Sequence, residues 1–163
     1  MSCESSTIFS DKQDEESVTI ILSEYGLTNV PKGISSLKNA RTLTILKNEN
    51  AWATFPPKSA WSKMVDSPPF DILPNEITAL SQLEELNIPG LNLKNLPDNF
   101  FELENLQSLN LSMNKLDITK EMSKLKQLRK LTSLTIYGNK LDTAQIQTWI
   151  RSSPGLTIDY IAN

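Results

Sequence analysis

Leucine and isoleucine recur along most of the chain in a fixed order with polar residues. Three segments, LEELNIPGLNL, LQSLNLSMNKL and LTSLTIYGNKL, begin at Leu83, Leu106 and Leu131 and share apolar positions one, four, six and eleven. Position nine is Asn in two of them and Leu91 in the first. Because alternate residues of a strand point to the same side, positions four and six predict one short, half-buried strand in each segment.

The same frame extends to units that begin at Ser17, Ala40 and Ser153. One unit cannot bury its own leucines, so we expect the units to stack and their strands to pair. The Asn at position nine, present as Asn48, Asn114 and Asn139, has an amide that can bond the backbone of the neighbouring turn. The frame predicts that the fourth-position residues lie side by side in the core: Ile20, Leu43, Leu86, Leu109, Leu134 and Leu156.

The second half of three units has a further pattern, in which Pro follows an apolar residue and two more apolar residues come three and six positions later. These segments begin at Val30, Leu73 and Leu96 and predict short helical turns on a convex side. The whole pattern resembles the leucine-rich-repeat family, in the class of about 23 residues common in bacterial proteins. The resemblance covers residues 17–163 and implies an α/β solenoid, an arc of about six short parallel strands with a convex side of 3-10 and short helical turns.

A cap is predicted at the C-terminal end of the stack, because open strand edges need a cover. Asp142 and Gln145 have the spacing of a capping box, and apolar residues follow at helical spacing before Pro154-Gly155 ends the helix. Residues 156–161 then predict a last strand. Trp149 at this spacing favours a core position over a ligand contact.

The charge of the chain is concentrated at its N-terminus. Residues 1–16 contain five carboxylates and one cation, Lys12, which gives them a charge of −4. Since the net charge of the chain is −3, the remaining residues carry a charge of +1. This segment is rich in Ser and poor in apolar residues, which is typical of disorder. We therefore expect a disordered acidic tail over 1–16 and a repeat domain over 17–163.

The second unit contains an insertion. It is 43 residues long where its neighbour has 23, and the excess falls at about 51–69, with Trp52, Phe55, Trp61 and Met64. These residue types are favoured at contacts, and long loops often carry function. Two interpretations remain open: the segment packs its aromatic residues onto the solenoid, or it binds a partner.

The predicted concave face is polar and nearly uncharged. The residues that we select on it as contacts for a protein or peptide are Thr44, Leu46, Asn87, Asn110 and Tyr137, and the alternative is that they are ordinary solvated strand residues. A basic cluster over 120–130 has the same two interpretations, as a site for anionic partners or as the solvated face of an amphipathic turn. The favoured function is non-enzymatic recognition, although the resemblance names no partner.

Several kinds of chemistry are excluded by composition. The chain has no His and one Cys, so it has no zinc site built on His or clustered Cys and no Ser-His-Asp or Cys-His catalysis. We find no catalytic constellation and expect no enzyme activity, no metal and no cofactor. A net charge of −3 and a pI near 5.0 argue against binding of nucleic acid.

Cys3 lies in a Ser-rich, acidic segment that resembles the acylated cysteine and tether of bacterial lipoproteins. If a signal peptide is removed ahead of it, the protein is an envelope or extracellular lipoprotein with a structural or adhesive role, and the lipid is its contact with the membrane. If none is removed, Cys3 is a free cysteine in a loose tail and the protein is cytoplasmic. We expect a monomer in either case.

Overall fold

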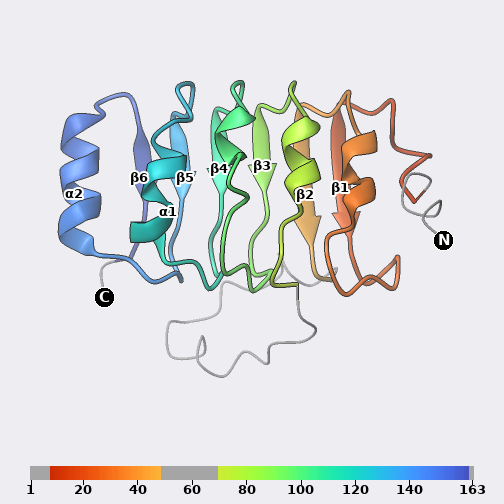
Figure 1. Ribbon diagram of the computed structural model, residues 1–163, viewed down its shortest axis with the longest axis horizontal. Coiled ribbons are helices and arrows are strands. Elements are labelled where there is room, and N and C mark those ends of the chain that lie inside the picture. Colours follow the sequence, from red (N-terminus) through yellow and green to blue (C-terminus); the bar gives the residue numbers. More distant parts are fainter. Residues whose placement is uncertain (1–7, 49–69, 162–163) are drawn as a thin grey trace.

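The computed structural model describes residues 8–48 and 70–161. Within them, six strands form one parallel sheet in which each strand pairs with the next strand of the chain (Figure 1). Their bounds are β1 Ser17–Ile21, β2 Thr42–Leu46, β3 Glu85–Asn87, β4 Ser108–Asn110, β5 Ser133–Thr135 and β6 Thr157–Asp159. The predicted number, order and direction of the strands are confirmed.

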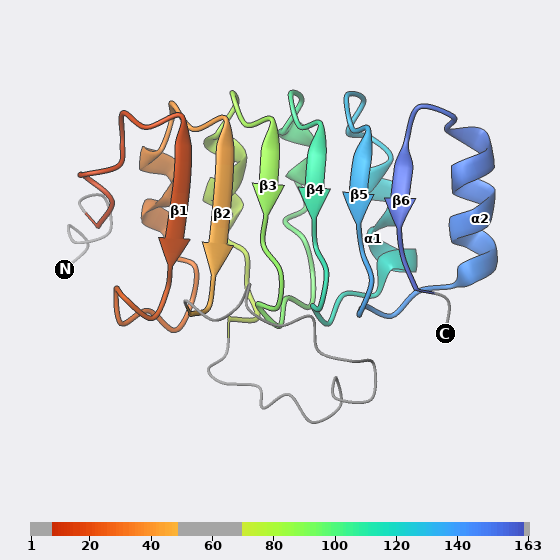
Figure 2. The same ribbon diagram turned by 180° about the vertical axis from the view of Figure 1, so that it is seen from behind.

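Short helices connect the strands and cover one face of the sheet, while the strands lie open on the other face (Figure 2). Within the described residues, the helices that follow β1, β2, β3 and β4 are η1 Lys32–Ser36, η4 Asn75–Ala79, η5 Phe100–Glu102 and α1 Ile118–Leu125. Ile34, Ile77 and Phe100, from the predicted second-half pattern, are completely buried against the strands. The chain is therefore an α/β solenoid of the leucine-rich-repeat type, with 3-10 and short α-helical turns on its convex side.

The register of the four central strands agrees with the prediction, but that of the two end strands does not. Leu43, Leu86, Leu109 and Leu134 are successive partners. At the N-terminal end the partner of Leu43 is Val18, and Ile20 pairs with Ile45 instead. At the C-terminal end the partner of Leu134 is Ile158, two residues beyond the predicted Leu156.

Both errors are shifts of two residues, and the hydrophobic pattern cannot detect such a shift. Side chains alternate with a period of two, so a two-residue shift leaves every apolar side chain on the buried face. Val18, Ile20 and Leu22 are all buried, which shows that the pattern suits either register. The backbone hydrogen bonds fix the register. Glu16 O accepts from Thr42 N at 2.9 Å, and the equivalent bond between β2 and β3 runs from Glu85 N to Arg41 O.

The predicted role of the Asn at position nine is confirmed for two residues. Asn114 Oδ1 accepts from the backbone N–H groups of Leu91 and Leu93 in the preceding repeat, at 2.9 and 3.1 Å. Its Nδ2 donates to the carbonyls of Ile88 and Leu111 at 2.9 Å. Asn139 makes equivalent bonds one repeat later. Asn48, the third member of the column, is exposed.

The turns after β3, β4 and β5 each have a left-handed residue at the same repeat position. Gly90, Met113 and Gly138 have φ values of 65°, 58° and 75°. A Cβ on Gly138 would lie 2.7 Å from Met113 Sδ and 3.0 Å from Met113 Cα, so the absence of a side chain there lets consecutive turns stack closely. The left-handed position is thus a second repeated feature of the solenoid, after the apolar columns.

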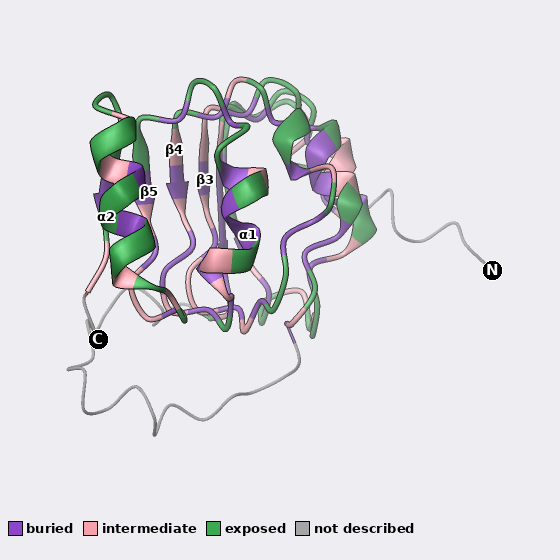
Figure 3. Cartoon of the chain, turned by 60° about the vertical axis from the view of Figure 1, so that its left-hand side comes forward, coloured by how far each residue is buried: buried purple, intermediate pink, exposed green. Residues whose placement is uncertain are grey.

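The C-terminal end is covered as predicted. Helix α2, Thr143–Ser152, lies at the end of the stack beyond β6, and Asp142 Oδ1 caps it by accepting from Ala144 N and Gln145 N at 2.9 and 3.3 Å (Figure 2). Ile146 and Trp149 face inward and are buried, while most of the helix's other residues are exposed (Figure 3). The core position favoured for Trp149 is confirmed.

The N-terminal end differs from the expectation of a disordered tail. Residues 8–16 lie beyond β1, and Phe9 is completely buried among the core residues of the first repeat. Its ring meets Tyr25 edge to face, with centroids 5.3 Å apart. Composition missed this contact because one aromatic residue in an acidic segment hardly changes its average. Residues 1–7 lie outside the described part of the chain.

Candidate functional site

The face of the sheet that no helix covers is the concave face, and its residues follow from the observed register. Its central row, one residue from each strand, is Thr19, Thr44, Asn87, Asn110, Thr135 and Asp159. Its end members, Thr19 and Asp159, lie two residues from Ile21 and Thr157, the fifth positions of the units that begin at Ser17 and Ser153. Parallel strands lie about 4.8 Å apart, so neighbouring members of the row are close enough to contact one ligand.

Asn87 and Asn110 form the centre of this row. Asn87 Nδ2 donates to Glu85 Oε1 at 2.8 Å and reaches Thr44 Oγ1 at 3.5 Å, which fixes the orientation of its amide. Asn110 Oδ1 accepts from Ser112 N at 3.0 Å. Among the described residues, the Asn87 amide oxygen and the Asn110 amide nitrogen have no hydrogen-bond partner. The pair therefore offers one acceptor and one donor, which is what a peptide group requires.

The other predicted contacts on this face differ in exposure. Tyr137 is half-buried at the edge of the face, next to the turn that contains Gly138. Thr44 and Leu46 expose only 7% and 2% of their surface. Of the five concave-face residues selected from the sequence, Asn87, Asn110 and Tyr137 thus have surface to offer a partner, and Thr44 and Leu46 have almost none in this structure.

The remaining predicted site residues belong to the insertion and to the N-terminus. Trp52, Phe55, Trp61 and Met64, and the possible lipidation site Cys3, lie outside the described residues. Phe70, the first described residue after the predicted insertion, is buried in the core. Phe70 therefore belongs to the core of the solenoid.

The electrostatics of the concave face are simple. Along its described strands, carboxylates occur at Glu85 and Asp159, and no Lys or Arg points from the same rows. No group of three metal-ligating side chains occurs within residues 8–48 and 70–161. In the same ranges, no helix is long and apolar enough to cross a bilayer. The face can supply hydrogen bonds and weak negative charge.

Two clear pKa shifts belong to ion pairs on other surfaces. The hydrogen bond from Lys140 Nζ, at 2.9 Å, lowers the pKa of Asp117. Burial acts to lower the pKa of Lys124, but hydrogen bonds to Glu121 and Asp98 outweigh it, and the net shift is upward. Lys124 also donates to Leu96 O at 2.7 Å, so this cluster ties α1 to the preceding repeat. Both shifts are explained by structural contacts.

Comparisons with known proteins assign this chain to no family. No protein-family model matches the sequence, and no curated protein matches it. Among solved structures, a leucine-rich-repeat protein of Leptospira interrogans is similar, with 24% sequence identity and a TM-score of 0.48. The match covers 80% of this chain and 33% of that one, so the present chain spans about a third of the length of its structural neighbour.

Proposed function

We propose that this protein is a non-enzymatic recognition module that binds a protein or peptide along its concave face. The observation that carries the proposal is the pair Asn87 and Asn110, which are register partners on an open sheet. The amide oxygen of Asn87 and the amide nitrogen of Asn110 have no hydrogen-bond partner among the described residues. Orientation by Glu85 and by the Ser112 backbone lowers the entropic cost of binding. We include Tyr137 in the site because its ring adds contact area at the edge of the face.

The insertion at about 51–69 belongs to the same proposal as a second contributor. Trp52 and Trp61 are the residues through which we expect it to add affinity, since buried aromatic residues often dominate interfaces. The segment follows β2 in the chain, and β2 pairs with the strand that contains Asn87, so we propose that one partner contacts both.

The proposal is tested by capturing partners on the full chain. The Asn87→Ala/Asn110→Ala variant should recover at least tenfold less of the partners that the unmodified protein retains, because the amide contacts are lost. Gln147→Ala removes an exposed amide from α2 and is the matched control, for which recovery should not change. Trp52→Ser/Trp61→Ser reports separately on the insertion. Equal recovery by all variants, with folding confirmed by circular dichroism, would disprove the proposal.

The alternative proposal, an envelope-anchored lipoprotein with a structural or adhesive role, depends on Cys3. Growth of cells that express the complete gene with labelled fatty acid should give a labelled protein, and Cys3→Ser should abolish the label. Recovery of unlabelled protein from the cytosol would reject this alternative without affecting the concave-face proposal.

A further inference from the structure

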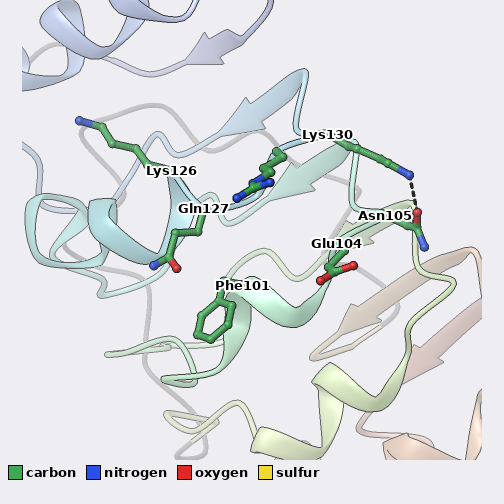
Figure 4. Close-up of a pocket in the computed structure, with 7 residues that line it drawn as sticks. Phe101, Glu104, Asn105, Lys126, Gln127 and Lys130 are labelled. Carbon is green, nitrogen blue, oxygen red and sulfur yellow. Dashed lines mark hydrogen bonds between the residues drawn. The ribbon is translucent and has the colours of Figure 1, made fainter.

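The convex side has a groove that is separate from the concave face. It lies between η5 and the turn that follows α1 and has a volume of about 680 Å³ (Figure 4). Phe101 and Glu104 lie on one side of it, and Lys126 and Lys130 come from the other side. Arg129 and Asn105 also line the groove. Three cations within five residues therefore line one groove.

Two of these cations are held by neutral partners. Lys126 Nζ lies 5.6 Å from the centroid of the Trp149 ring, which attracts the cation without neutralising it. Lys130 Nζ donates to Asn105 Oδ1 at 2.7 Å, again to an uncharged oxygen. The ammonium groups are thus oriented while their charge remains available to a ligand.

Six other cations of the described chain are paired with carboxylates. Ion pairs with carboxylates are formed by Lys12, Lys32, Arg41, Lys94, Lys124 and Lys140. Within residues 8–48 and 70–161, no carboxylate pairs with Lys126, Arg129 or Lys130, although Glu104 lines the same groove. The three cations against this one carboxylate leave a local charge of +2, on a chain whose net charge is −3.

Apolar surface lies on both sides of the cations. Phe101, which lies beside Gln127, is 40% exposed. It is one of two large apolar side chains in the described residues with at least this much exposure. A second cavity, of about 310 Å³, lies against Lys126 and Arg129 and is lined by Leu131, Trp149 and Leu156. A ligand that pairs with the cations would therefore have apolar pockets within reach.

From these contacts we propose that the convex groove binds an acidic segment of a partner protein, with an apolar side chain of that segment in the cavity beside Trp149. Carboxylates would pair with Arg129 and with the two oriented lysines, and Arg129 has the planar donor geometry that suits a carboxylate. A peptide fits this groove better than a bilayer does, because the cations line a recess, which a single chain can enter and a flat headgroup surface cannot. The concave face would remain free for its own partner.

The test uses the full chain and a fluorescein-labelled peptide of six Asp and Glu residues around a central Leu. Fluorescence anisotropy at low ionic strength should show binding, because exposed charges are little screened there. Arg129→Glu should weaken binding about tenfold, and Glu104→Gln should strengthen it about twofold, since it removes a repulsive charge from the groove. Lys38→Glu changes the net charge equally on another surface and should leave the affinity unchanged.

Four outcomes would overturn the proposal. The first is no binding of the peptide by the unmodified protein, and the second is equal weakening by Arg129→Glu and Lys38→Glu. The third is binding to vesicles with 30% phosphatidylserine but not to the peptide, which would indicate a membrane surface. The fourth is concentration-dependent self-association in sedimentation that Arg129→Glu abolishes, which would make a second copy the occupant.

Discussion

The repeats from β3 to β5 and the two ends of the sheet are held in different ways. Between β3 and β5, each repeat is joined to its neighbour by buried side-chain amides at Asn114 and Asn139, in addition to the backbone ladder. At the ends, the first repeat is covered by Phe9 and the last by α2. The centre therefore adds repeated polar contacts to its apolar core, whereas each end is closed by an element that occurs once. A solenoid needs both, because a repeat alone supplies no cover for its terminal units.

The largest effect should come from breaking the central contacts. Asn114→Ala leaves the buried N–H groups of Leu91 and Leu93 and several carbonyls without partners, and we expect it to lower the free energy of unfolding by about 4 kcal/mol. Denaturant unfolding measures this value. Asn48→Ala, an exposed residue at the same repeat position, is the control and should cost less than about 0.5 kcal/mol. Similar values for the two variants would mean that the amide bonds contribute little.

The N-terminal cover should give the next largest effect. Phe9→Ala removes a completely buried ring, which costs about 3 kcal/mol in typical cores. Hydrogen exchange of the β1 amides should accelerate more than that of the β4 amides, because the end of the stack opens first. Phe101→Ala removes an exposed ring and is the control, and it should change neither the free energy of unfolding nor the exchange of the β1 amides. Uniform acceleration across the sheet would show that the end does not open independently.

The smallest expected effect comes from the N-terminal cap residues of the two α-helices. Asp142→Ala removes the cap of α2 and should cost about 1 kcal/mol in thermal or denaturant unfolding. Asp117 occupies the equivalent position before α1 but makes no cap bond to the helix, so Asp117→Ala should cost less, through loss of its exposed pair with Lys140. The opposite order would reject the role given to the cap.

The sequence predicted features that repeat and missed features that occur once. Strand number, strand order, the buried Asn114 and the cap at Asp142 follow from spacings that recur or from known local motifs. The register of β1 and β6 could not follow, since a two-residue shift keeps Val18 and Ile20 buried alike. Phe9 could not follow either, because its contact with Tyr25 depends on how the chain enters the first repeat.

The candidate site shows the same limit. Asn87, Asn110 and Tyr137 were predicted from strand alternation and do lie on the concave face, with surface available. The burial of Leu46 was not predicted, because alternation gives the side of the sheet but not what lies above it. The basic residues near α1 were visible in the sequence as a cluster. That Lys126 and Lys130 have neutral partners depends on contacts 23 and 25 residues away in the chain, with Trp149 and Asn105.

The left-handed residues at Gly90, Met113 and Gly138 have a consequence for the size of the molecule. The backbone turns in the same sense at the same position of consecutive coils. A repeat with the conformation of residues 83–105 can therefore stack on the repeat before it and on the repeat after it. A tandem copy of this 23-residue block, spliced in after Asn105, should extend the ribbon by one strand, or about 4.8 Å, and leave both termini covered. Overall length is thus a quantity that can be adjusted in whole units without redesign of the ends.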